Sequence, residues 1–384
     1  MKAVILAAGE GRRLEPLTNT RPKPMLPVAN EPILGRVIES VARAGIEEVL
    51  LVVGYKSDRI QQYVGDGDDW GVAVTYAEQS KQLGTGDAVL QAEPSVDGEF
   101  LVLNGDRIVD AGVIESVMER RASTGEPVMA VAHAEEPELY GVVSLEGDRV
   151  VDLIEKPSPH EFHSDLINAG VYAFDTSIFG EIRATSTHGE LALTDVLAAR
   201  LPDRPIQAVP DRGSWFDVTR PWDLLSVNSA LLAGDPAPDR QAVPDTAAVS
   251  DGVGFGNTVS VYPGAAVLQG SAVGENVSIE PNVTVSNSIL MDDVTVEAGA
   301  VLRDAVVAEN VTIGPNATVV GGPADVILQD TVHHDVPLGG VIGDNATIGG
   351  DVTVSPGSFV GNGARIDHGA TVEGRIEPNG RVQR

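Results

Sequence analysis

Apolar residues follow two different periodicities in the two parts of the chain. Up to about residue 232, short apolar runs such as 2–7 and 48–53 alternate with stretches like 31–44, in which apolar residues recur at helical spacing. Buried strands that alternate with amphipathic helices are typical of an α/β domain with a mainly parallel sheet. We also expect strands at 72–76, 99–103, 127–132, 141–145, 150–154 and 169–174, and a closing helix at 221–232.

Beyond residue 246 the aliphatic residues recur every six positions. A coil of three short flat strands, about 18 residues per turn, has this period, because each face turns one side chain inward. Residues 320–341 interrupt the repeat, and we expect a loop or a bulging coil there. The domain resembles the left-handed parallel β-helix of hexapeptide-repeat proteins, which implies the handedness and a trimer. The expected inward series is Val249, Phe255, Val261, Val267, Val273, Ile279 and Val285, then Val301, Val307, Ile313 and Val319, then Ile342, Ile348, Val354, Val360, Ile366 and Val372.

Residues 233–246 (AGDPAPDRQAVPDT) separate the two patterns. They are rich in proline and aspartate and contain few large apolar residues, which is typical of a linker. The predicted organisation is therefore an α/β domain over 1–232, a linker over 233–246 and a β-helix over 247–384.

The charge balance is strongly acidic. The 26 basic and 56 acidic residues give a formal charge of −30, and only five of the basic residues are lysines. Acidic residues are spread through the chain, a pattern that looks like proteins from salt-loaded cytoplasm, where self-repulsion is screened. We therefore expect a halophilic source, and no nucleic-acid partner, because such a surface repels phosphate backbones.

Other features of the composition exclude several classes of protein. The chain has no cysteine, so disulfides, thiolate metal sites and cysteine nucleophiles are absent. The longest apolar run, 49–53, is too short to cross a bilayer, and 3–8 is too brief for a signal peptide. We expect a cytoplasmic protein with no membrane partner.

A basic loop follows the first predicted strand. Residues 8–11 (AGEG) precede the cations Arg12, Arg13, Arg21 and Lys23. Backbone N–H groups at the carboxyl end of a strand, flanked by cations, are suited to hold phosphate. The loop is not a Walker A motif, because no Gly-Lys-Ser/Thr follows, and it lacks the third glycine of a dinucleotide fingerprint.

The loop also carries a family resemblance. Residues 6–14 (LAAGEGRRL), 16–18 (PLT) and 21–28 (RPKPMLPV) resemble the signature of sugar-1-phosphate nucleotidylyltransferases, the NDP-sugar pyrophosphorylases. The resemblance implies a Rossmann-like nucleotidyltransferase domain, similar to archaeal-type glucose-1-phosphate thymidylyl/uridylyltransferases and bifunctional N-acetylglucosamine-1-phosphate uridylyltransferases. It makes Arg13 and Lys23 the catalytic phosphate-binding pair. Arg12 stands where the family usually has Thr, so its role, grouped here with nucleotide binding, stays open.

Two aspartates are candidates for a Mg²⁺ site. Asp106 follows an apolar strand, and Asp217 in 213–218 (GSWFDV) resembles the second metal position of the family. Mg²⁺ prefers one or two carboxylates together with phosphate oxygens and waters. An Asp after a strand is often only a helix cap, and this is the role expected for Asp110 and Asp223.

Nucleotide recognition is expected in the glycine-rich stretch 78–88 (EQSKQLGTGDA). The amide of Gln79 offers a donor and an acceptor that match the edge shared by uracil and thymine. Gly84 and Thr85 match the family's Gly-Thr that lies against the nucleotide. The resemblance also implies contacts with the nucleotide from the opening loop, at Ala7, Ala8, Gly9 and Gly11.

Three later motifs resemble the family's sugar-binding stations. They are 140–143 (YGVV), 155–157 (EKP) and 168–172 (NAGVY). The implied sugar-phosphate contacts are made by Gly141, Glu155, Lys156 and Asn168.

The predicted reaction is attack of a hexose-1-phosphate on the α-phosphorus of UTP or dTTP, which yields an NDP-sugar and pyrophosphate. Both the sugar (glucose or N-acetylglucosamine) and the base stay open. One alternative adds acetylation of glucosamine-1-phosphate with acetyl-CoA on the β-helix, where His333, His334 and His368 are the available bases. Another is a catalytically silent regulatory subunit.

Overall fold

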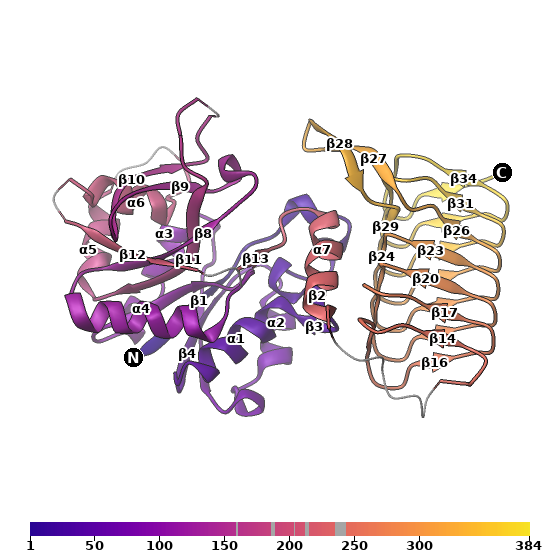
Figure 1. Cartoon of the computed structure of the whole chain (residues 1–384), viewed down its shortest axis with the longest axis horizontal. Coiled ribbons are helices and arrows are strands. Elements are labelled where there is room, and N and C mark those ends of the chain that lie inside the picture. The colour runs from indigo at the N-terminus through magenta and orange to yellow at the C-terminus, as the bar shows by residue number, and fades with distance from the viewer. Residues whose placement is uncertain (159, 186–188, 203, 212–214, 235–242) are drawn as a thin grey trace. The chain divides into compact units, whose positions relative to one another are not determined.

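The computed structural model describes residues 1–158, 160–185, 189–202, 204–211, 215–234 and 243–384 (Figure 1). It divides into two compact units. The first, here called the sheet unit, comprises Met1–Glu10 and Ile33–Asp217, and the second, the coil unit, comprises Gly11–Pro32 and Val218–Arg384. The basic loop therefore belongs to the coil unit. Of the predicted linker, residues 235–242 lie outside the described residues.

A nine-stranded sheet in the order β5-β4-β1-β6-β11-β8-β12-β10-β9 forms the centre of the sheet unit. Its first four strands are parallel, with Leu6 opposite both Val52 and Asn104. The strands are β1 (Lys2–Ala7), β4 (Glu48–Val53), β5 (Ala73–Glu78), β6 (Phe100–Asn104), β8 (Val128–His133), β9 (Gly141–Glu146), β10 (Arg149–Glu155), β11 (Leu166–Phe174) and β12 (Ile206–Pro210).

The predicted Rossmann-like fold is confirmed, but the sheet is mixed. Strand β11 runs antiparallel to both β6 and β8, and β10 runs antiparallel to β9 and β12. The residues between β9 and β10 form a short turn, and a connection of this length joins only antiparallel strands.

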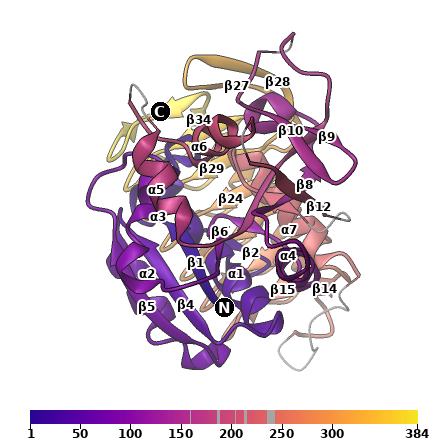
Figure 2. The ribbon, with the colours of Figure 1, turned by 90° about the vertical axis from the view of Figure 1, so that its left-hand side faces the viewer.

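Helices cover both faces of this sheet (Figure 2). One continuous apolar core joins α3, α5 and α6 to Val4, Leu6 and their neighbours, so alternate residues of β1 face these three helices. Helices α1 and α4 contact each other on the opposite face. The helices are α1 (Ile33–Arg43), α2 (Ser57–Val64), α3 (Thr85–Leu90), α4 (Ala111–Thr124), α5 (Ser177–Ala184), α6 (Leu193–Arg200) and, in the coil unit, α7 (Pro221–Leu232), which has the bounds predicted for it.

Three seven-stranded parallel sheets form the coils, in an arrangement consistent with the predicted left-handed β-helix. Each turn of the chain contributes one strand to each sheet. The first sheet contains β14 (Ala248–Val249), β17 (Ala266–Val267), β20 (Thr284–Ser286), β23 (Val301–Arg303), β26 (Thr318–Val319), β31 (Thr353–Val354) and β34 (Thr371–Val372). The second contains β15 (Gly254–Phe255), β18 (Ala272–Val273), β21 (Ile289–Leu290), β24 (Ala305–Val307), β29 (Gly340–Ile342), β32 (Ser358–Val360) and β35 (Arg375–Ile376). The third contains β16 (Ser260–Val261), β19 (Ser278–Ile279), β22 (Thr295–Val296), β25 (Thr312–Ile313), β30 (Thr347–Ile348), β33 (Arg365–Ile366) and β36 (Arg381–Val382).

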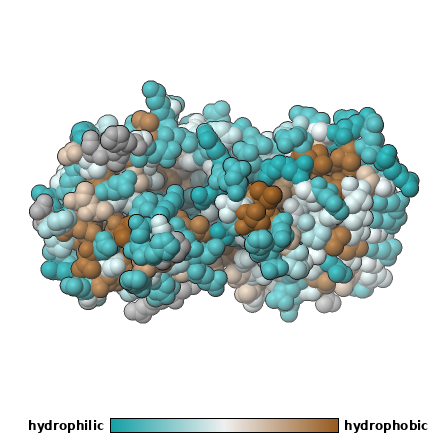
Figure 3. All heavy atoms as spheres, turned by 90° about the horizontal axis from the view of Figure 1, so that it is seen from above, coloured by the Kyte–Doolittle hydropathy of each residue, from teal (hydrophilic) through white to brown (hydrophobic). Residues whose placement is uncertain are grey.

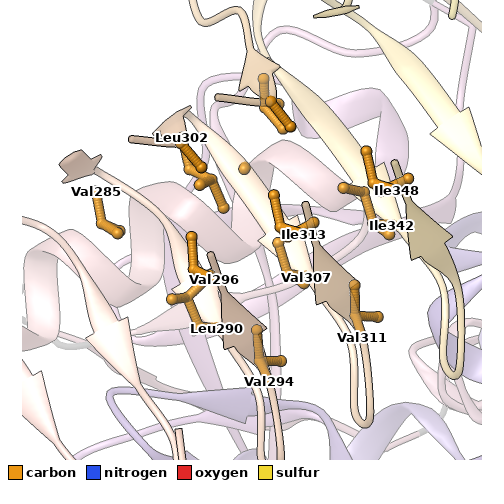
Figure 4. Packing of buried hydrophobic residues seen from close by; sticks show 14 of the residues in the cluster. Val285, Leu290, Val294, Val296, Leu302, Val307, Val311, Ile313, Ile342 and Ile348 are labelled. Atoms are coloured by element: carbon orange, nitrogen blue, oxygen red, sulfur yellow. The ribbon is translucent and has the colours of Figure 1, made fainter. Parts of the chain in front are cut away.

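Side chains from all three sheets fill the centre of the coils (Figure 4). Among the residues of the predicted inward series only Val301 is misplaced: Leu302 points into the core opposite Val285. The series also skipped Leu290 and Val296, which are in the core. Two corners are one residue shorter than the repeat, at Asn287 between Val285 and Leu290 and at Asp304 between Leu302 and Val307. Both corner residues have a left-handed φ, 44° and 50°, and the hydroxyl of Ser288 donates to the carbonyl of Ser286 at 2.7 Å.

An antiparallel hairpin occupies the segment where the repeat breaks. Strands β27 (Pro323–Leu328) and β28 (Thr331–Pro337) pair with each other between β26 and β29. At the tip, Gln329 and Asp330 have φ values of 47° and 65°, as a tight two-residue hairpin turn requires.

Most of the surface seen in Figure 3 is hydrophilic, and its hydrophobic residues form separate groups. Ile327 and Val332, directly opposite each other on the hairpin, are 66% and 49% exposed. Within the described parts of the chain, none of the helices has the length and apolar character needed to cross a membrane.

Candidate functional site

The carboxyl ends of parallel strands β1, β4 and β6 meet at one edge of the sheet. Ala7 and Ala8 end β1 and are buried, and the N–H of Gly105, after β6, donates to the carbonyl of Leu6 at 2.9 Å. Such an edge is where open α/β sheets bind ligands. The side-chain amide of Gln82 donates to the carbonyl of Ala8 at 3.2 Å, which joins the glycine-rich stretch to the end of β1. The sequence analysis had not singled out Gln82.

Gln79 is buried at the start of this stretch. Its side-chain amide donates to the carbonyl of Gly84 at 3.1 Å and to Oδ2 of Asp87 at 2.9 Å. These two bonds fix the orientation of the side chain before any ligand binds. Its carbonyl oxygen is then the atom best suited to recognise a base.

Gly84 and Thr85 make a close internal contact at the start of α3. Gly84 has a φ of 100°, and a Cβ there would lie 2.4 Å from the carbonyl oxygen of Leu191. The hydroxyl of Thr85 accepts the N–H of Leu193 at 2.8 Å. Glycine is therefore required at position 84 by the backbone packing as well as by any nucleotide.

A short two-stranded sheet brings the two predicted metal ligands close together. Strands β7 (Arg107–Ile108) and β13 (Phe216–Asp217) run antiparallel, with Asp217 opposite Arg107, the residue that follows Asp106. The side chain of Asp217 is only 4% exposed. Residues 106 and 217, far apart in sequence, thus lie at neighbouring positions of one ladder.

Arg107 is a cation beside these carboxylates that the sequence analysis missed. Its Nε lies 4.0 Å from Oδ2 of Asp217, and its Nη1 donates to the carbonyl of Asn168 at 2.8 Å. The guanidinium also lies over the rings of Tyr140 and Trp215, at 5.4 and 5.8 Å from their centroids. Burial alone would lower the pKa of Arg107, but the nearby Asp217 and Asp106 raise it above its ordinary value. Arg107 therefore stays charged and partly neutralises the pair.

The predicted sugar-binding residues lie on three strands at one end of the sheet. Gly141 on β9 pairs with Glu155 on β10, and Ile167, next to Asn168 on β11, pairs with Val142. The hydroxyl of Thr194 donates to Oε2 of Glu155 at 2.8 Å and orients this carboxylate from α6.

Asn168 is buried and fully oriented. Its Nδ2 donates to the hydroxyl of Tyr172 at 2.5 Å, and its Oδ1 accepts the N–H of Gly170 at 3.0 Å. Burial raises the pKa of Tyr172 to about 12, although Arg107 and the bond from Asn168 act against the shift. Tyr172 is thus a protonated phenol that holds Asn168 in place.

Lys156 is more open to solvent than its neighbours. Its side chain is 58% exposed, and its Nζ lies 3.8 Å from Oε1 of Glu155. An exposed ammonium on a flexible stem is suited to reach an anionic group of a ligand.

Residues Gly11–Pro32, here called the signature loop, belong to the coil unit and fold compactly. The loop contains three 3₁₀ turns, Arg12–Leu14, Leu17–Asn19 and Lys23–Met25. Gly11 has a φ of 73°, and a Cβ there would lie 2.7 Å from Cβ of Lys23, so the stem of Lys23 passes close to Gly11. The hydroxyl of Thr18 closes this turn by donating to the carbonyl of Gly11 at 3.0 Å.

The four cations of this loop differ in their surroundings. Arg12 is exposed, and Arg13 and Lys23 are half-buried. Nε of Arg13 donates to Oε1 of Gln329 at the tip of the hairpin, at 3.2 Å. Arg21 is only 2% exposed and is enclosed by the coils. The sequence analysis placed Arg21 among the cations that flank a phosphate site. Its burial and its ion pair with Asp344 indicate a structural role instead.

The predicted helix caps are confirmed. Oδ1 of Asp110 accepts the N–H of Gly112 at 2.8 Å at the start of α4. Oδ2 of Asp223 accepts the backbone N–H groups of Thr219 and Arg220 at 2.9 and 2.7 Å. These two acids are held by helix starts, unlike Asp106 and Asp217.

The three histidines of the coil unit contact different partners. The ring of His333 packs against Trp222 with centroids 5.3 Å apart, and Nδ1 of His334 lies 3.1 Å from Oδ1 of Asp325. Nδ1 of His368 accepts the N–H of Gly350 at 2.7 Å.

Comparison with protein families shows which class this arrangement belongs to. Residues 2–234 match the nucleotidyl transferase family, and residues 249–338 match the GMPPB C-terminal domain. The first match covers more than half of the chain, so the chain belongs to the nucleotidyl transferase family. The matched range contains every residue that the sequence analysis assigned to phosphate, nucleotide, metal or sugar.

Several curated proteins are similar to 60% of the chain. The bifunctional protein GlmU of Methanococcus maripaludis is 40% identical over 235 residues, which are 60% of this chain and 54% of that protein. The glucose-1-phosphate thymidylyltransferase of Streptomyces antibioticus is 37% identical over 238 residues, 60% of this chain and 66% of that protein. The low-salt glycan biosynthesis nucleotidyltransferase Agl11 of Haloferax volcanii is 35% identical with the same coverage. The chain matches about half the length of the GlmU relatives.

Solved structures show the same fold. A protein from Bacillus anthracis described as a glucose-1-phosphate thymidylyltransferase, in complex with sucrose, has a TM-score of 0.57 and 26% identity, and covers 62% of this chain and 98% of its own. A UDP-glucose pyrophosphorylase complexed with UDP-glucose shares the fold at a TM-score of 0.54 and 23% identity, and covers 60% of this chain and 97% of its own.

Proposed function

We propose that this protein is a sugar-1-phosphate nucleotidylyltransferase that makes an NDP-sugar and pyrophosphate from UTP or dTTP and a hexose-1-phosphate. The observation that carries the proposal is the pairing of β7 with β13, which brings Asp106 and Asp217 to neighbouring positions. Membership of the nucleotidyl transferase family and the sugar-nucleotide names of the relatives support the same reaction.

The reaction needs little covalent help from the protein. An oxygen of the sugar phosphate forms a bond to the α-phosphorus, and the bond from that phosphorus to the oxygen bridging to the β-phosphorus breaks. Because the nucleophile is already an anion, no general base is required. The difficulties are the approach of two polyanions and the charge that develops on the leaving pyrophosphate.

Arg13 and Lys23 would meet these difficulties. Arg13 would bind two phosphate oxygens through its planar guanidinium, and Lys23 would act as a point charge. The close approach of the Lys23 stem to Gly11 limits the positions that its ammonium can reach. This supports a role in holding one phosphate rather than screening the whole loop.

Asp106 and Asp217 would hold Mg²⁺. Among the described residues these two carboxylates belong to no group of three or more potential metal ligands. A pair of carboxylates suits this ion, which takes its remaining ligands from phosphate and water. Bound there, Mg²⁺ would neutralise charge on the triphosphate. Arg107 supports the fit, because its positive charge lies 4.0 Å from Oδ2 of Asp217 and offsets part of the repulsion between the two carboxylates.

Gln79 would read the base, and Gly141, Glu155, Lys156 and Asn168 would bind the sugar phosphate. With its amide donors held by Gly84 and Asp87, Gln79 would accept the N3–H common to uracil and thymine. The carboxylate of Glu155, oriented by Thr194, would accept sugar hydroxyls. We also propose that the coils assemble the protein into trimers, which sedimentation analysis would measure.

A substrate matrix tests the function. The purified protein is incubated with Mg²⁺ and four hexose-1-phosphates, each against UTP and dTTP, and pyrophosphate release is followed. We expect turnover with at least one pair. Release from none of them, in low or high salt, would contradict the proposal.

Two substitutions test the roles. Arg13→Ala and Asp106→Asn should each lower kcat by about 10²–10³, because each removes charge stabilisation from a site with little water. The matched controls are Arg43→Ala, which removes an exposed arginine paired with Glu39, and Asp110→Asn, which keeps a helix cap. Both controls should retain the parent rate.

A further inference from the structure

Arg21 forms a buried ion pair with the coils. Its Nη2 lies 2.5 Å from Oδ1 of Asp344 and 3.1 Å from Oε1 of Glu309, and its Nη1 lies 2.8 Å from the sulfur of Met291. Asp344 is buried like Arg21, with side-chain exposures of 3% and 2%. An ion pair this deeply buried has one geometry, because any displacement would leave a charge unpaired.

Other hydrogen bonds fix Asp344 in the coils. Its Oδ1 accepts the backbone N–H of Glu309 at 3.1 Å. Its Oδ2 accepts the hydroxyl of Thr20 at 2.6 Å and the amide of Asn362 at 3.3 Å. Asp344 therefore joins two residues of the signature loop to two different coils.

Stability alone does not account for this pair. Replacing a buried ion pair by apolar residues of similar size is often neutral or stabilising. Nε of Arg21 is buried and has no hydrogen-bond partner among the residues that the structure describes. The pair fixes a position at the cost of a polar group without a partner.

The position that it fixes belongs to the signature loop. Arg21 is followed by Pro22 and then by Lys23. Proline restricts φ, and Pro22 has a φ of −73° and a ψ of 157°, so there is little freedom between the anchored Arg21 and Lys23.

Two more contacts hold the same loop. The buried Asn228 on α7 accepts the N–H of Ala29 at 2.8 Å and donates to the carbonyl of Gly270 at 2.8 Å, which links the end of the loop to a coil. Gln329, at the tip of the hairpin, accepts a hydrogen bond from Arg13. The loop is thus attached at its start, its middle and its end.

We infer that the β-helix contributes to nucleotidyl transfer by orienting the signature loop. Arg21 and Asp344 are positioning residues that hold Arg13 and Lys23 in the orientation needed to bind the triphosphate. The inference rests on the proposed function, and it adds that the coils do more than assemble the protein. A misplacement of about 1 Å in a phosphate-binding group costs about 10²-fold in rate. A loop rich in 3₁₀ turns needs such an external support.

The test compares a single and a double substitution in the full-length protein. Asp344→Asn breaks the pair and leaves Arg21 buried and poorly compensated. Arg21→Met with Asp344→Leu removes both charges and should recover part of the thermal stability, because the buried charge is gone although Thr20 and Asn362 still lose Asp344 as an acceptor. The double substitution does not restore the anchor. We expect kcat/KM for the nucleotide to fall about tenfold or more in both variants, while Tm recovers in part and only in the double one. Asp367→Asn, which breaks the exposed pair with Arg381 on the same β-helix, is the matched control.

Hydrogen exchange of residues 11–26 provides a readout that does not need activity. Exchange in this segment should be faster in both variants than in the parent, with residues 260–285 unchanged. A double variant that regains activity together with Tm, or a loop whose exchange does not change, would overturn the inference. A parent protein without turnover would instead refute the proposed function, and the exchange experiment would still decide whether the coils hold the loop.

Discussion

Arg107 shows how one side chain joins two parts of the sheet unit. It lies beside Asp217 and Asp106 on one side, and it donates to the carbonyl of Asn168 on the other. The guanidinium is 17% exposed, so its charge is poorly screened by water. Arg107 therefore supports the two carboxylates and also the strand that carries Asn168, the amide proposed to bind the sugar.

Replacing Arg107 by Gln should destabilise the sheet unit substantially. The substitution removes a positive charge beside the buried side chain of Asp217 and a donor to the carbonyl of Asn168, and we expect a loss of about 3 kcal/mol in the free energy of unfolding. Urea unfolding measures this change. Arg120→Gln, which breaks a pair with the largely exposed Asp148, should cost at most about 1 kcal/mol. Equal losses in the two variants would show that Arg107 is no more than a surface charge.

Tyr172 should make stability depend on alkaline pH. Its folded pKa of about 12 lies above the ordinary value of 10.0, so between these values the unfolded chain releases a proton that the folded chain keeps. The contribution of Tyr172 to the free energy of unfolding is therefore fully present below about pH 10. It falls by roughly 2–3 kcal/mol as the pH rises to about 12.

The substitution Tyr172→Phe isolates this effect. Denaturation midpoints at about pH 9 and about pH 11 should differ less in Tyr172→Phe than in the parent, because the titrating group is gone. Tyr172→Phe should also cost about 1–3 kcal/mol at neutral pH, since Nδ2 of the buried Asn168 loses its acceptor. Tyr262→Phe, at an exposed position, is the control, and its denaturation midpoints at the two pH values should differ as much as those of the parent.

The sequence motifs predicted candidate site residues, but not the contacts that orient them. Asp106, Asp217 and Glu155 were singled out by the residues around them. Arg107 and Thr194 were not, because their partners come from the register of β7 with β13 and from the packing of α6 against β10. Such contacts depend on tertiary pairing, which no local pattern contains.

At the scale of elements, the regular coils were predicted more accurately than the places where the repeat changes, the short corners and a hairpin. The six-residue period identified most inward residues of the series, since each position repeats the same environment, but it skipped Leu290 and Val296. The short corner at Asp304 shifted the series by one residue, so Leu302 rather than Val301 enters the core. The hairpin of β27 and β28 was expected only as a loop or bulge, because its pairing is not part of the repeat.

The corrected register predicts different costs for two adjacent residues. Leu302→Ala should lower the free energy of unfolding by about 2–5 kcal/mol, because it removes a fully buried side chain and leaves a cavity between three sheets. Val301→Ala, at a half-buried position outside the core, should cost about 1 kcal/mol or less. Thermal or urea unfolding of the two variants gives the comparison. A larger loss for Val301→Ala would restore the uninterrupted six-residue register.

At the scale of the whole molecule, the charge of −30 is the dominant feature. This charge remains after every basic residue is counted, and several ion pairs, such as Lys2 with Glu48 and Arg43 with Glu39, lie at the surface, where pairs contribute little. Repulsion among the remaining acids therefore opposes folding in dilute buffer. The same field would repel the proposed triphosphate and sugar phosphate, and the cations at residues 12–23 would act against it locally.

Salt should stabilise this protein rather than weaken it. Raising KCl from about 0.1 M to about 2 M shortens the Debye length from about 10 Å to about 2–3 Å, which removes most repulsion between exposed carboxylates. The pair of Arg21 with Asp344 is buried and largely escapes this screening. We therefore expect Tm to rise steadily with KCl, measured by calorimetry, and Asp344→Asn to lower Tm by a similar amount at every salt concentration. A Tm that stays constant or falls with salt would mean that the acidic surface does not limit stability, and that the expectation of a halophilic source has no physical support.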